Sequence, residues 1–365
     1  LLSRRGITTA EDAENFLNPS YNLHLHDPLR MTDMEKAARR FADAIIAKEK
    51  ILIWSDYDCD GIPGAVVLHD FLKKVGATFD NHIPHRHDDG YGMNSVGVEK
   101  VITQGARLII TVDSGITDLE PVARAHELGA DVIVTDHHLP KETLPPAFAV
   151  VNPNARSDEP YPFHALCGAA VAWKLVCATL PLIRATQVSR GEEPVSEGWE
   201  KWLLDMVGLA TIADMVPLVG ENRVLARYGL MVLRKSPRLG LQKLCRVTRV
   251  NQRTMTEDDV GFSIAPRINA ASRMGDALDA FHLLTTDSED RADTLAKKIE
   301  AANRRRKAEA GSITRAVHAR LKERTTLRDV IALGDPTWRP ALLGLVANGI
   351  ADEYDRPVFL WGREG

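Results

Sequence analysis

The sequence predicts an α/β fold: a doubly wound, mostly parallel sheet with helical additions, a long connecting helix and the start of a second α/β domain. Three observations predict it. Short apolar runs alternate with helical stretches between residues 51 and 135, the order typical of β-α-β crossover units. A helical pattern of unusual length follows at 289–324, and strand-like stretches resume at 329–361.

These patterns divide the chain into four parts. A helical leader precedes the first apolar strand, and the long helical pattern separates the core from a final unit. The last residues come directly after a strand-like stretch, so we expect the final unit to be incomplete. The expected parts are a leader packed on the core at 1–50, an α/β core at 51–288, a connecting helix at 289–325 and the beginning of a C-terminal domain at 326–365.

Two helices are expected in the leader, each announced by a capping box. Thr9 is followed three residues later by Asp12, and Thr32 is followed by Glu35. Such a pair supplies hydrogen-bond partners for the free N–H groups of a helix start. The second helix also carries an apolar stripe, formed by Met34, Phe41, Ala42 and Ile45.

Hydrophobic periodicity and helix-ending glycines define the core elements. The expected order is strand 51–54, helix 63–75, strand 108–112, helix 119–128 and strand 131–135. Helices are also expected at 167–182 and 200–216, joined by a polar loop whose composition predicts exposure. The stripe of the long helix consists of Leu295, Ile299, Ala302, Ile313, Val317 and Leu321.

The composition is that of an ordinary soluble protein from a reducing compartment. The 46 Lys and Arg against 50 Asp and Glu give a net charge of −4, so nucleic-acid binding would need a local basic patch. The four cysteines have neither metal-binding nor disulfide spacing. No apolar run approaches the roughly 20 residues of a membrane span, and no signal peptide is recognisable. We expect a cytoplasmic monomer without membrane association.

Three aspartates at alternate positions follow the first strand. In "ILIWSDYDCDG", Asp56, Asp58 and Asp60 point the same way if the backbone is extended. Converging carboxylates are tolerated when a divalent cation or backbone donors lie among them. A calcium EF-hand loop is excluded because its twelfth position, which needs a glutamate, is Val67. An acidic surface turn remains the alternative for this motif taken alone.

Two further strands end in possible metal ligands. Asp113 follows the second apolar run, and Asp136, His137 and His138 follow the third. The carboxyl ends of parallel strands share one edge of a sheet, where ligands bind. Carboxylates with imidazole and without thiolate suit manganese or magnesium, with zinc as a further option. Each residue alone could be a helix cap or a structural hydrogen-bond partner, but three such strand ends together favour a metal site.

A fourth carboxylate, Asp214, ends an otherwise apolar helix in "LLDMVGLATIADMVPL". A charge in such surroundings is costly unless it is paired or bound to a metal. The alternatives to metal ligation are a helix cap or a salt bridge to Arg223 or Arg227.

The motifs "DYDCDG", "TVDSGI", "VTDHHLP", "VNPN", "GLATIADMVPL" and "RINAASR" resemble, in order and spacing, the DHH phosphoesterase superfamily. The resemblance is strongest to its RecJ-like branch of single-stranded-DNA exonucleases. The leader and "HDDGYGMN" also look like that branch, so the resemblance covers essentially the whole chain. It implies a DHH core and a DHH-associated C-terminal domain.

The resemblance also implies roles for individual residues. The metal-binding positions of the family fall on Asp58, Asp60, Asp113, His137 and Asp214. The catalytic set adds Asp56 in a supporting role and His138, which helps the metals or the phosphate. The nucleic-acid backbone would be contacted by Asn269 and Arg273, with Arg267 assisting; the alternative for the arginines is an exposed salt bridge.

Some positions depart from the family pattern. Trp54 stands where many relatives have a possible histidine ligand, Ser272 replaces a glycine, and Arg339 stands where the family usually shows histidine. The basic run at 304–307 is expected to be the solvated face of a helix unless it borders the cleft.

The resemblance implies a metal-dependent 5′-to-3′ exonuclease that hydrolyses single-stranded DNA to 5′-mononucleotides in DNA repair and recombination. Its cofactors would be two divalent cations, manganese in first place and magnesium in second, that activate water and stabilise the leaving oxygen. Implied partners are single-stranded DNA, a single-strand-binding protein and a helicase. Two alternatives remain open: a DHH phosphoesterase for small nucleotides or short oligoribonucleotides, and a catalytically degenerate replication scaffold.

Overall fold

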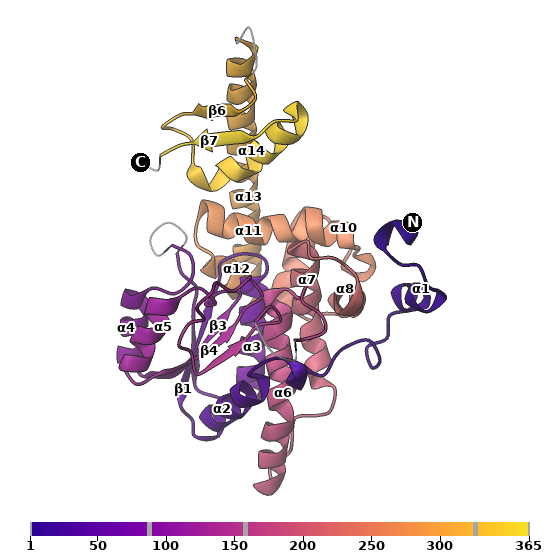
Figure 1. The fold of residues 1–365 in the computed structure, drawn as a ribbon, viewed down its shortest axis with the longest axis vertical. Coiled ribbons are helices and arrows are strands. Elements are labelled where there is room, and N and C mark those ends of the chain that lie inside the picture. The colour runs from indigo at the N-terminus through magenta and orange to yellow at the C-terminus, as the bar shows by residue number, and fades with distance from the viewer. Residues whose placement is uncertain (1, 86–89, 156–159, 324–327, 364–365) are drawn as a thin grey trace.

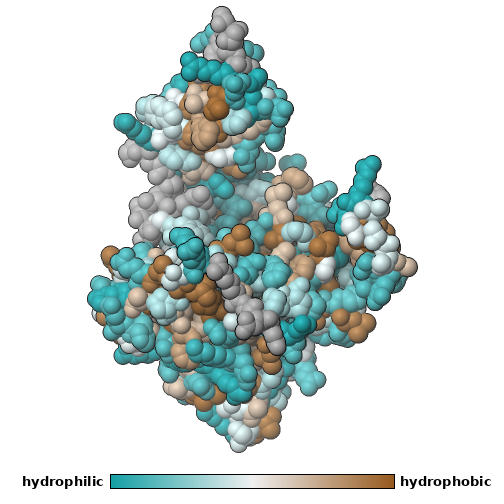
Figure 2. All heavy atoms as spheres, in the orientation of Figure 1, coloured by the Kyte–Doolittle hydropathy of each residue, from teal (hydrophilic) through white to brown (hydrophobic). Residues whose placement is uncertain are grey.

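The computed structural model describes residues 2–85, 90–155, 160–323 and 328–363. Figure 1 shows a sheet with helices on both faces, a helical region beside it, and a smaller C-terminal unit carried on one long helix. In the space-filling view this unit stands above the rest of the molecule and joins it through a narrower waist (Figure 2).

The central sheet has five strands in the order β2-β1-β3-β4-β5, and every neighbouring pair is parallel. The predicted parallel α/β class is therefore confirmed. The strands are β1 (Lys50–Ser55), β2 (Phe79–His82), β3 (Ala106–Val112), β4 (Asp131–Thr135) and β5 (Ala149–Val151). The edge strands β2 and β5 were not predicted, because β2 has a single large apolar residue and β5 has only three residues.

Helices cover both faces of the sheet because neighbouring residues of a strand point to opposite sides. Ile51 and Ile53 belong to the larger core, and Leu52 and Trp54 belong to a second core on the other face. The larger core is covered by α2 (Met34–Ile46), α3 (Gly61–Lys74) and α6 (Gly168–Ser189), and the smaller one by α4 (Ser95–Thr103) and α5 (Leu119–Glu127) (Figure 1).

The leader contains the short helices η1 (Ser3–Arg5), α1 (Ala10–Leu17) and η2 (Pro28–Arg30) before α2. The first predicted helix start is confirmed, since the Thr9 hydroxyl accepts from the Asp12 N–H. The second is wrong: α2 is preceded by Asp33, whose φ is 57°, and its first turn has no side-chain cap. The Asp33 carboxylate instead accepts from the N–H of Val150 in β5, so a tertiary contact sets this helix start.

Helices dominate the chain after the sheet. Helix α6 continues to Ser189, seven residues beyond its predicted end, and carries Pro181 inside it. The helix predicted at 200–216 is a 3₁₀ helix, η3 (Trp199–Leu203), followed by α7 (Leu204–Ala213). The remaining elements are α8 (Gly220–Leu233), α9 (Leu239–Thr248), η4 (Gln252–Thr254), α10 (Glu257–Asp259), the π-helical turn η5 (Val260–Ile264), α11 (Ala265–Met274) and α12 (Leu278–Thr285).

The long helix α13 (Glu289–Lys322) confirms the predicted helical pattern. Its first half packs on the core through Ile299, and its second half packs on the C-terminal unit through Val317 and Leu321. That unit consists of β6 (Ile331–Gly334), α14 (Pro340–Tyr354) and β7 (Val358–Trp361), with β6 and β7 paired in parallel. Helix α13 therefore joins two separately packed units.

Helix α6 corrects the expectation that no apolar stretch approaches the length of a membrane span. By length and composition alone its 22 residues could cross a membrane. However, 72% of its most apolar window is buried inside the protein. Such burial is typical of a core helix.

Candidate metal centre

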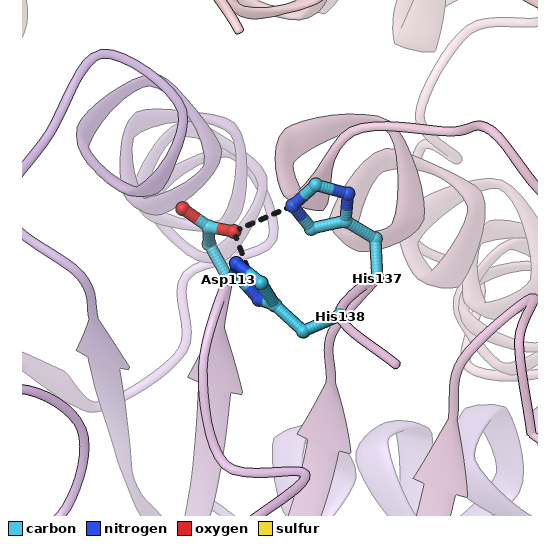
Figure 3. Close-up of side chains that lie close together, drawn as sticks. All are labelled: Asp113, His137 and His138. Carbon is cyan, nitrogen blue, oxygen red and sulfur yellow. Dashed lines mark ion pairs between the residues drawn. The ribbon is translucent and has the colours of Figure 1, made fainter. Parts of the chain in front are cut away.

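Carboxylates and imidazoles from three strands meet at the carboxyl edge of the sheet. Figure 3 shows Asp113, just after β3, with its carboxylate facing the rings of His137 and His138, which follow β4. The Asp113 Oδ1 atom lies 3.1 Å from His137 Nε2 and 3.9 Å from His138 Nδ1. His137 Nε2 also lies 3.6 Å from Asp60 Oδ2 and 4.0 Å from Asp214 Oδ2. The structure thus brings together residues that are far apart in the sequence.

Asp60 is held by the start of the long core helix α6. Its two carboxylate oxygens accept from the N–H groups of Gly168 and Ala169, at 2.6 and 2.8 Å. These are the first N–H groups of the helix, which have no partner within it and carry partial positive charge. These two hydrogen bonds stabilise the ionised carboxylate, but they only partly offset its burial, and the pKa of Asp60 stays raised. Residue patterns gave no indication of this contact.

Asp58 and Asn269 fix the acidic loop between β1 and α3. Asp58 Oδ1 accepts from the N–H groups of Asp60 and Gly61, which closes the turn at the start of α3. Asn269 Oδ1, on α11, accepts from the Cys59 N–H at 2.8 Å. Helix α11 thereby supports the aspartate loop directly, a role that the sequence did not suggest for Asn269.

Asp113 has a left-handed backbone conformation, with φ of 60°. Its N–H donates to Thr135 on β4, and its carbonyl accepts from the Tyr91 hydroxyl at 3.1 Å. This conformation turns the chain sharply after β3. Asp113 as a whole is 3% exposed, and its carboxylate faces the other site residues.

Asp136 positions the two histidines and does not itself join the group. Its Oδ1 accepts from the N–H groups of His137 and His138, and lies 2.8 Å from His138 Nδ1. Asn152 and Asn154, from the "VNPN" stretch, donate to the carbonyls of His138 and His137. A histidine whose ring bonds to a carboxylate has a fixed orientation and tautomer. The hydrogen bond to Asp136 also raises the pKa of His138.

Asp214 lies at the end of α7 and is not engaged by the arginines considered as alternatives. Arg223 donates to the Phe16 carbonyl, and Arg227 donates to the Leu17 carbonyl. Both arginines therefore hold the leader. Burial and the nearby Asp60 and Asp58 carboxylates raise the pKa of Asp214 to about 7.

The carboxylates of this group repel one another when no cation lies among them. Burial raises the pKa of Asp113 well above its usual value, and the neighbouring carboxylates of Asp60, Asp58 and Asp56 add to the effect. Burial likewise raises the pKa of Asp60. A divalent ion would favour the ionised forms and resolve this repulsion. The donor set therefore fits a bound metal.

Three overlapping sets of residues could each hold an ion, because within each set the ligand atoms lie within 4.8 Å of one another. Asp113 and His137 each belong to two of these sets, so two neighbouring ions could share ligands. The sets are Asp113, His137 and His138; Asp60, His137 and Asp214; and Asp56, Asp58 and Asp113. Carboxylate oxygens with one or two imidazoles suit manganese or magnesium.

The residues predicted to contact nucleic acid are divided by the structure. Asn269 and Arg273 line the same cavity of about 470 Å³ as the metal-site residues. Arg273 also donates to the Ala341 carbonyl at the start of α14, linking the core to the C-terminal unit. Arg267 lies elsewhere: it pairs with Glu300 at 2.8 Å, with both side chains 12% exposed. Arg267 therefore forms a salt bridge, as in the alternative, but a largely buried one and not an exposed one, and it does not line the cavity.

Two departures from the family pattern have structural roles. The Trp54 indole donates to the Gly92 carbonyl and contacts the His82 ring, with ring centroids 4.1 Å apart and the planes tilted by 49°. It therefore supports the loop that carries Tyr91. The Arg339 side chain lies 3.4 Å from that of Glu309 on α13.

The basic run at 304–307 has partners within the protein. Arg304 pairs with Glu300, Arg305 donates to the Met274 carbonyl, and Arg306 donates to Asn303 Oδ1.

Gly168 is expected to be essential for the geometry of the centre. A Cβ atom at this position would lie 2.6 Å from Asp113 Cβ and 2.9 Å from its Cα. We expect Gly168→Ala to displace Asp113 and to lower Mn²⁺ affinity about ten- to hundred-fold, as changes around metal ligands do. Titration calorimetry would measure the affinity. Gly349→Ala, in α14 with open space around it, is the matched control; equal affinities in the two variants would contradict the prediction.

The fold and the site define a DHH phosphoesterase, and comparison with known proteins agrees. Residues 50–211 match the DHH family, N-terminal domain. A crystal structure of exonuclease RecJ bound to manganese is 33% identical, with a TM-score of 0.79 over 91% of this chain and 80% of that one. RecJ from Thermus thermophilus in complex with Mn²⁺ is 31% identical, with a TM-score of 0.80 over 99% of this chain and 49% of that one.

Curated relatives extend the comparison. The single-stranded-DNA-specific exonuclease RecJ of Bacillus subtilis is 37% identical over 99% of this chain and 44% of its own length. That of Escherichia coli is 33% identical over 100% of this chain and 63% of its own length. The chain belongs to the RecJ family, and it spans about half the length of the curated relatives it matches.

Proposed function

We propose that this chain is the catalytic part of a metal-dependent 5′-to-3′ exonuclease that hydrolyses single-stranded DNA to 5′-mononucleotides in DNA repair and recombination. The overlap of three ligand sets around Asp113 and His137 carries the proposal. The names of the relatives support the substrate and the chemistry, and solved RecJ structures with Mn²⁺ or Mg²⁺ support the cofactors. Manganese is the first candidate for the two ions.

The chain's own residues would divide the work. We assign the ions to Asp58, Asp60, Asp113, His137 and Asp214, with Asp56 in support. When bound, the ions supply an activated water, charge neutralisation of the phosphate and stabilisation of the leaving oxygen.

His138 is suited to a phosphate contact. Its Nδ1 is engaged with Asp136, which leaves Nε2 to carry a proton toward a non-bridging oxygen. The side chain is 48% exposed, and the bond to Asp136 favours the protonated ring. Arg273, at the cavity wall, adds a second positive charge for the strand backbone.

Single-strand specificity suggests how the protein would work in the cell. Such an enzyme needs duplex DNA to be opened, so we propose a helicase and a single-strand-binding protein as partners. The chain would act as a monomer in the cytoplasm. The scaffold alternative is disfavoured because the five positions that match metal-binding residues of the family all carry possible ligands here, although Trp54 replaces one further possible histidine.

The function is tested by comparing two substrates in Mn²⁺. We expect a single strand of about 30 nucleotides, labelled at its 5′ end, to release labelled mononucleotide first, and a dinucleotide to be hydrolysed much more slowly. Chelation with EDTA should stop both reactions. Faster hydrolysis of the dinucleotide would favour the small-substrate alternative. Release of the label only at the end of digestion would contradict the 5′ polarity.

A further inference from the structure

One segment of the chain has a charge balance unlike the rest. Residues 222–256 contain nine of the 46 Lys and Arg and none of the 50 Asp and Glu. The chain as a whole is acidic, with a net charge of −4. The segment comprises most of α8, together with α9 and η4. Helix α8 lies on the side of the molecule opposite α4 and α5 (Figure 1).

Part of this charge is used inside the protein. Arg238 is enclosed by Asp70 and Asp205, and Lys243 pairs with Glu289. Arg223 and Arg227 hold carbonyls of the leader. These four residues therefore have structural partners and are not available to a ligand.

Three of the five remaining basic residues line a hollow. A depression of about 660 Å³ lies between the end of α8, α9 and η4. Its wall contains three basic side chains, two glutamines and no carboxylate: Met231, Arg234, Lys235, Ser236, Gln242, Gln252 and Arg253. Among the ion pairs of the described residues, none involves Arg234, Lys235 or Arg253. Lys235 and Arg253 are exposed.

Hydrogen bonds hold this wall in shape. Gln252 donates its amide Nε2 to the carbonyls of Leu233 and Ser236, which ties η4 to the end of α8. Arg234 donates Nε to the Met255 carbonyl at 2.8 Å, which fixes its guanidinium beside the hollow. Cations near the end of α8 also suit the helix dipole, but Arg253 lies outside that helix and is not explained in this way.

The position of the hollow relative to the metal centre follows from helix packing. Helices α7 and α8 pack so closely that a Cβ on Gly208 would lie 2.5 Å from Gly229 Cα. A short connection joins Asp214, at the end of α7, to Gly220, at the start of α8. Since the two helices also pack side by side, they run in opposite directions. The 14 residues of α8 then carry the chain on the order of 20 Å away from the metal centre.

We propose that this basic hollow, formed by Arg234, Lys235, Arg253 and the two glutamines, binds the phosphate backbone of the single-stranded substrate at a distance from the metal centre. The inference rests on the proposed function and adds a second contact region to it. Unpaired cations with amide donors bind a polyanion without reading its sequence. An acidic peptide is the less suitable ligand, because Met231 is the single large apolar side chain of the wall and peptide grooves need apolar anchors.

Steady-state kinetics with Mn²⁺ and oligothymidylates of about 25 and 3 nucleotides would test the proposal. We expect Lys235→Gln/Arg253→Gln to raise KM for the long strand about ten-fold without a change in its kcat. For the short strand, neither kcat nor KM should change. The plot of log affinity against log salt should become shallower by about 1.4 for two lost phosphate contacts. The control is Lys100→Gln/Arg107→Gln, because both side chains are exposed, Lys100 on α4 and Arg107 at the start of β3, and neither lines the hollow.

The outcomes separate the two proposals. An unchanged KM and salt slope for the long strand would overturn the hollow as a binding site while leaving the exonuclease intact. If the wild-type protein hydrolysed neither strand, the proposed function would fail, and fluorescence anisotropy of the long strand in EDTA would still measure the effect of the double variant. If the double variant lost affinity for poly-glutamate and for oligothymidylate to the same extent, the hollow would be a general site for acidic polymers. This result would contradict the assignment to nucleic acid.

Discussion

Asp113→Asn is expected to lower turnover at least a thousand-fold, to abolish stabilisation by Mn²⁺, and to raise the melting temperature of the metal-free protein. Asp113 belongs to two of the three ligand sets, so its charge serves both candidate ions. Loss of about 4 kcal/mol of transition-state stabilisation corresponds to this factor. Asparagine keeps the side-chain shape and tolerates the φ of 60°, which alanine would strain.

The expected gain in metal-free stability follows from the direction of the pKa shifts. The pKa of Asp113 is raised by burial and by its neighbouring carboxylates, above the value in the unfolded chain. An acid whose pKa is raised by folding favours the folded state at low pH, and this contribution is lost as pH rises through the folded pKa. Asparagine removes that loss. The difference in melting temperature between variant and wild type should therefore grow as pH rises from the acidic range, where an unfolded aspartate titrates, toward the raised pKa of Asp113.

Differential scanning calorimetry with and without Mn²⁺ measures both effects. Asp355→Asn is the matched control, because Asp355 has φ of 50°, lies exposed at the end of α14 and belongs to none of the three ligand sets. The control should keep activity and Mn²⁺ stabilisation. An Asp113→Asn protein that is still stabilised by Mn²⁺ as strongly as the wild type would refute the assignment of Asp113 as a ligand.

The strand ends of the site could be predicted because their signals are local. An apolar run followed by Asp113, or by His137 and His138, identifies a buried strand and its polar end within a few residues. The rule that parallel strands share a carboxyl edge then brings the residues together without knowledge of their contacts. The same reasoning failed for β2, whose sequence "FDNH" has no apolar periodicity.

The supporting contacts could not be predicted because they join distant segments. Gly168 meets Asp60 across 108 positions, and Asn269 meets Cys59 across 210 positions. Nothing in the local sequence at either end specifies the partner. Arg267 shows the same limit: its spacing from Asn269 suggested a phosphate clamp, but the nearby Glu300 on α13 engages its charge.

Lys174→Met is expected to reduce the free energy of unfolding by about 3–5 kcal/mol, the usual cost of breaking a buried ion pair. Lys174, on α6, and Glu221, on α8, are 1% and 0% exposed, and their charged atoms lie 2.7 Å apart. Lys174 also donates to the His26 carbonyl, while Glu221 accepts from the His26 N–H and the Tyr161 hydroxyl. The substitution would leave the Glu221 carboxylate buried without a counter-charge.

The double variant Lys174→Met/Glu221→Gln separates lost charge balance from lost packing. Glutamine can still accept from the His26 N–H through its side-chain oxygen and carries no charge to be compensated, so we expect the double variant to be more stable than Lys174→Met. Urea denaturation would measure all three proteins. Arg39→Met breaks an exposed pair with Glu35, at 64% and 66% exposure, and should change stability by less than about 0.5 kcal/mol.

This buried pair also connects to the metal centre through α6. Lys174 lies less than two turns after Gly168, whose N–H holds Asp60. If the pair fixes the helix and the leader as one unit, Lys174→Met should weaken Mn²⁺ affinity, and saturating Mn²⁺ should recover part of the lost stability because the ion binds only the folded protein. Lys174→Met with wild-type stability would show that the network around Glu221 does not depend on its charge partner.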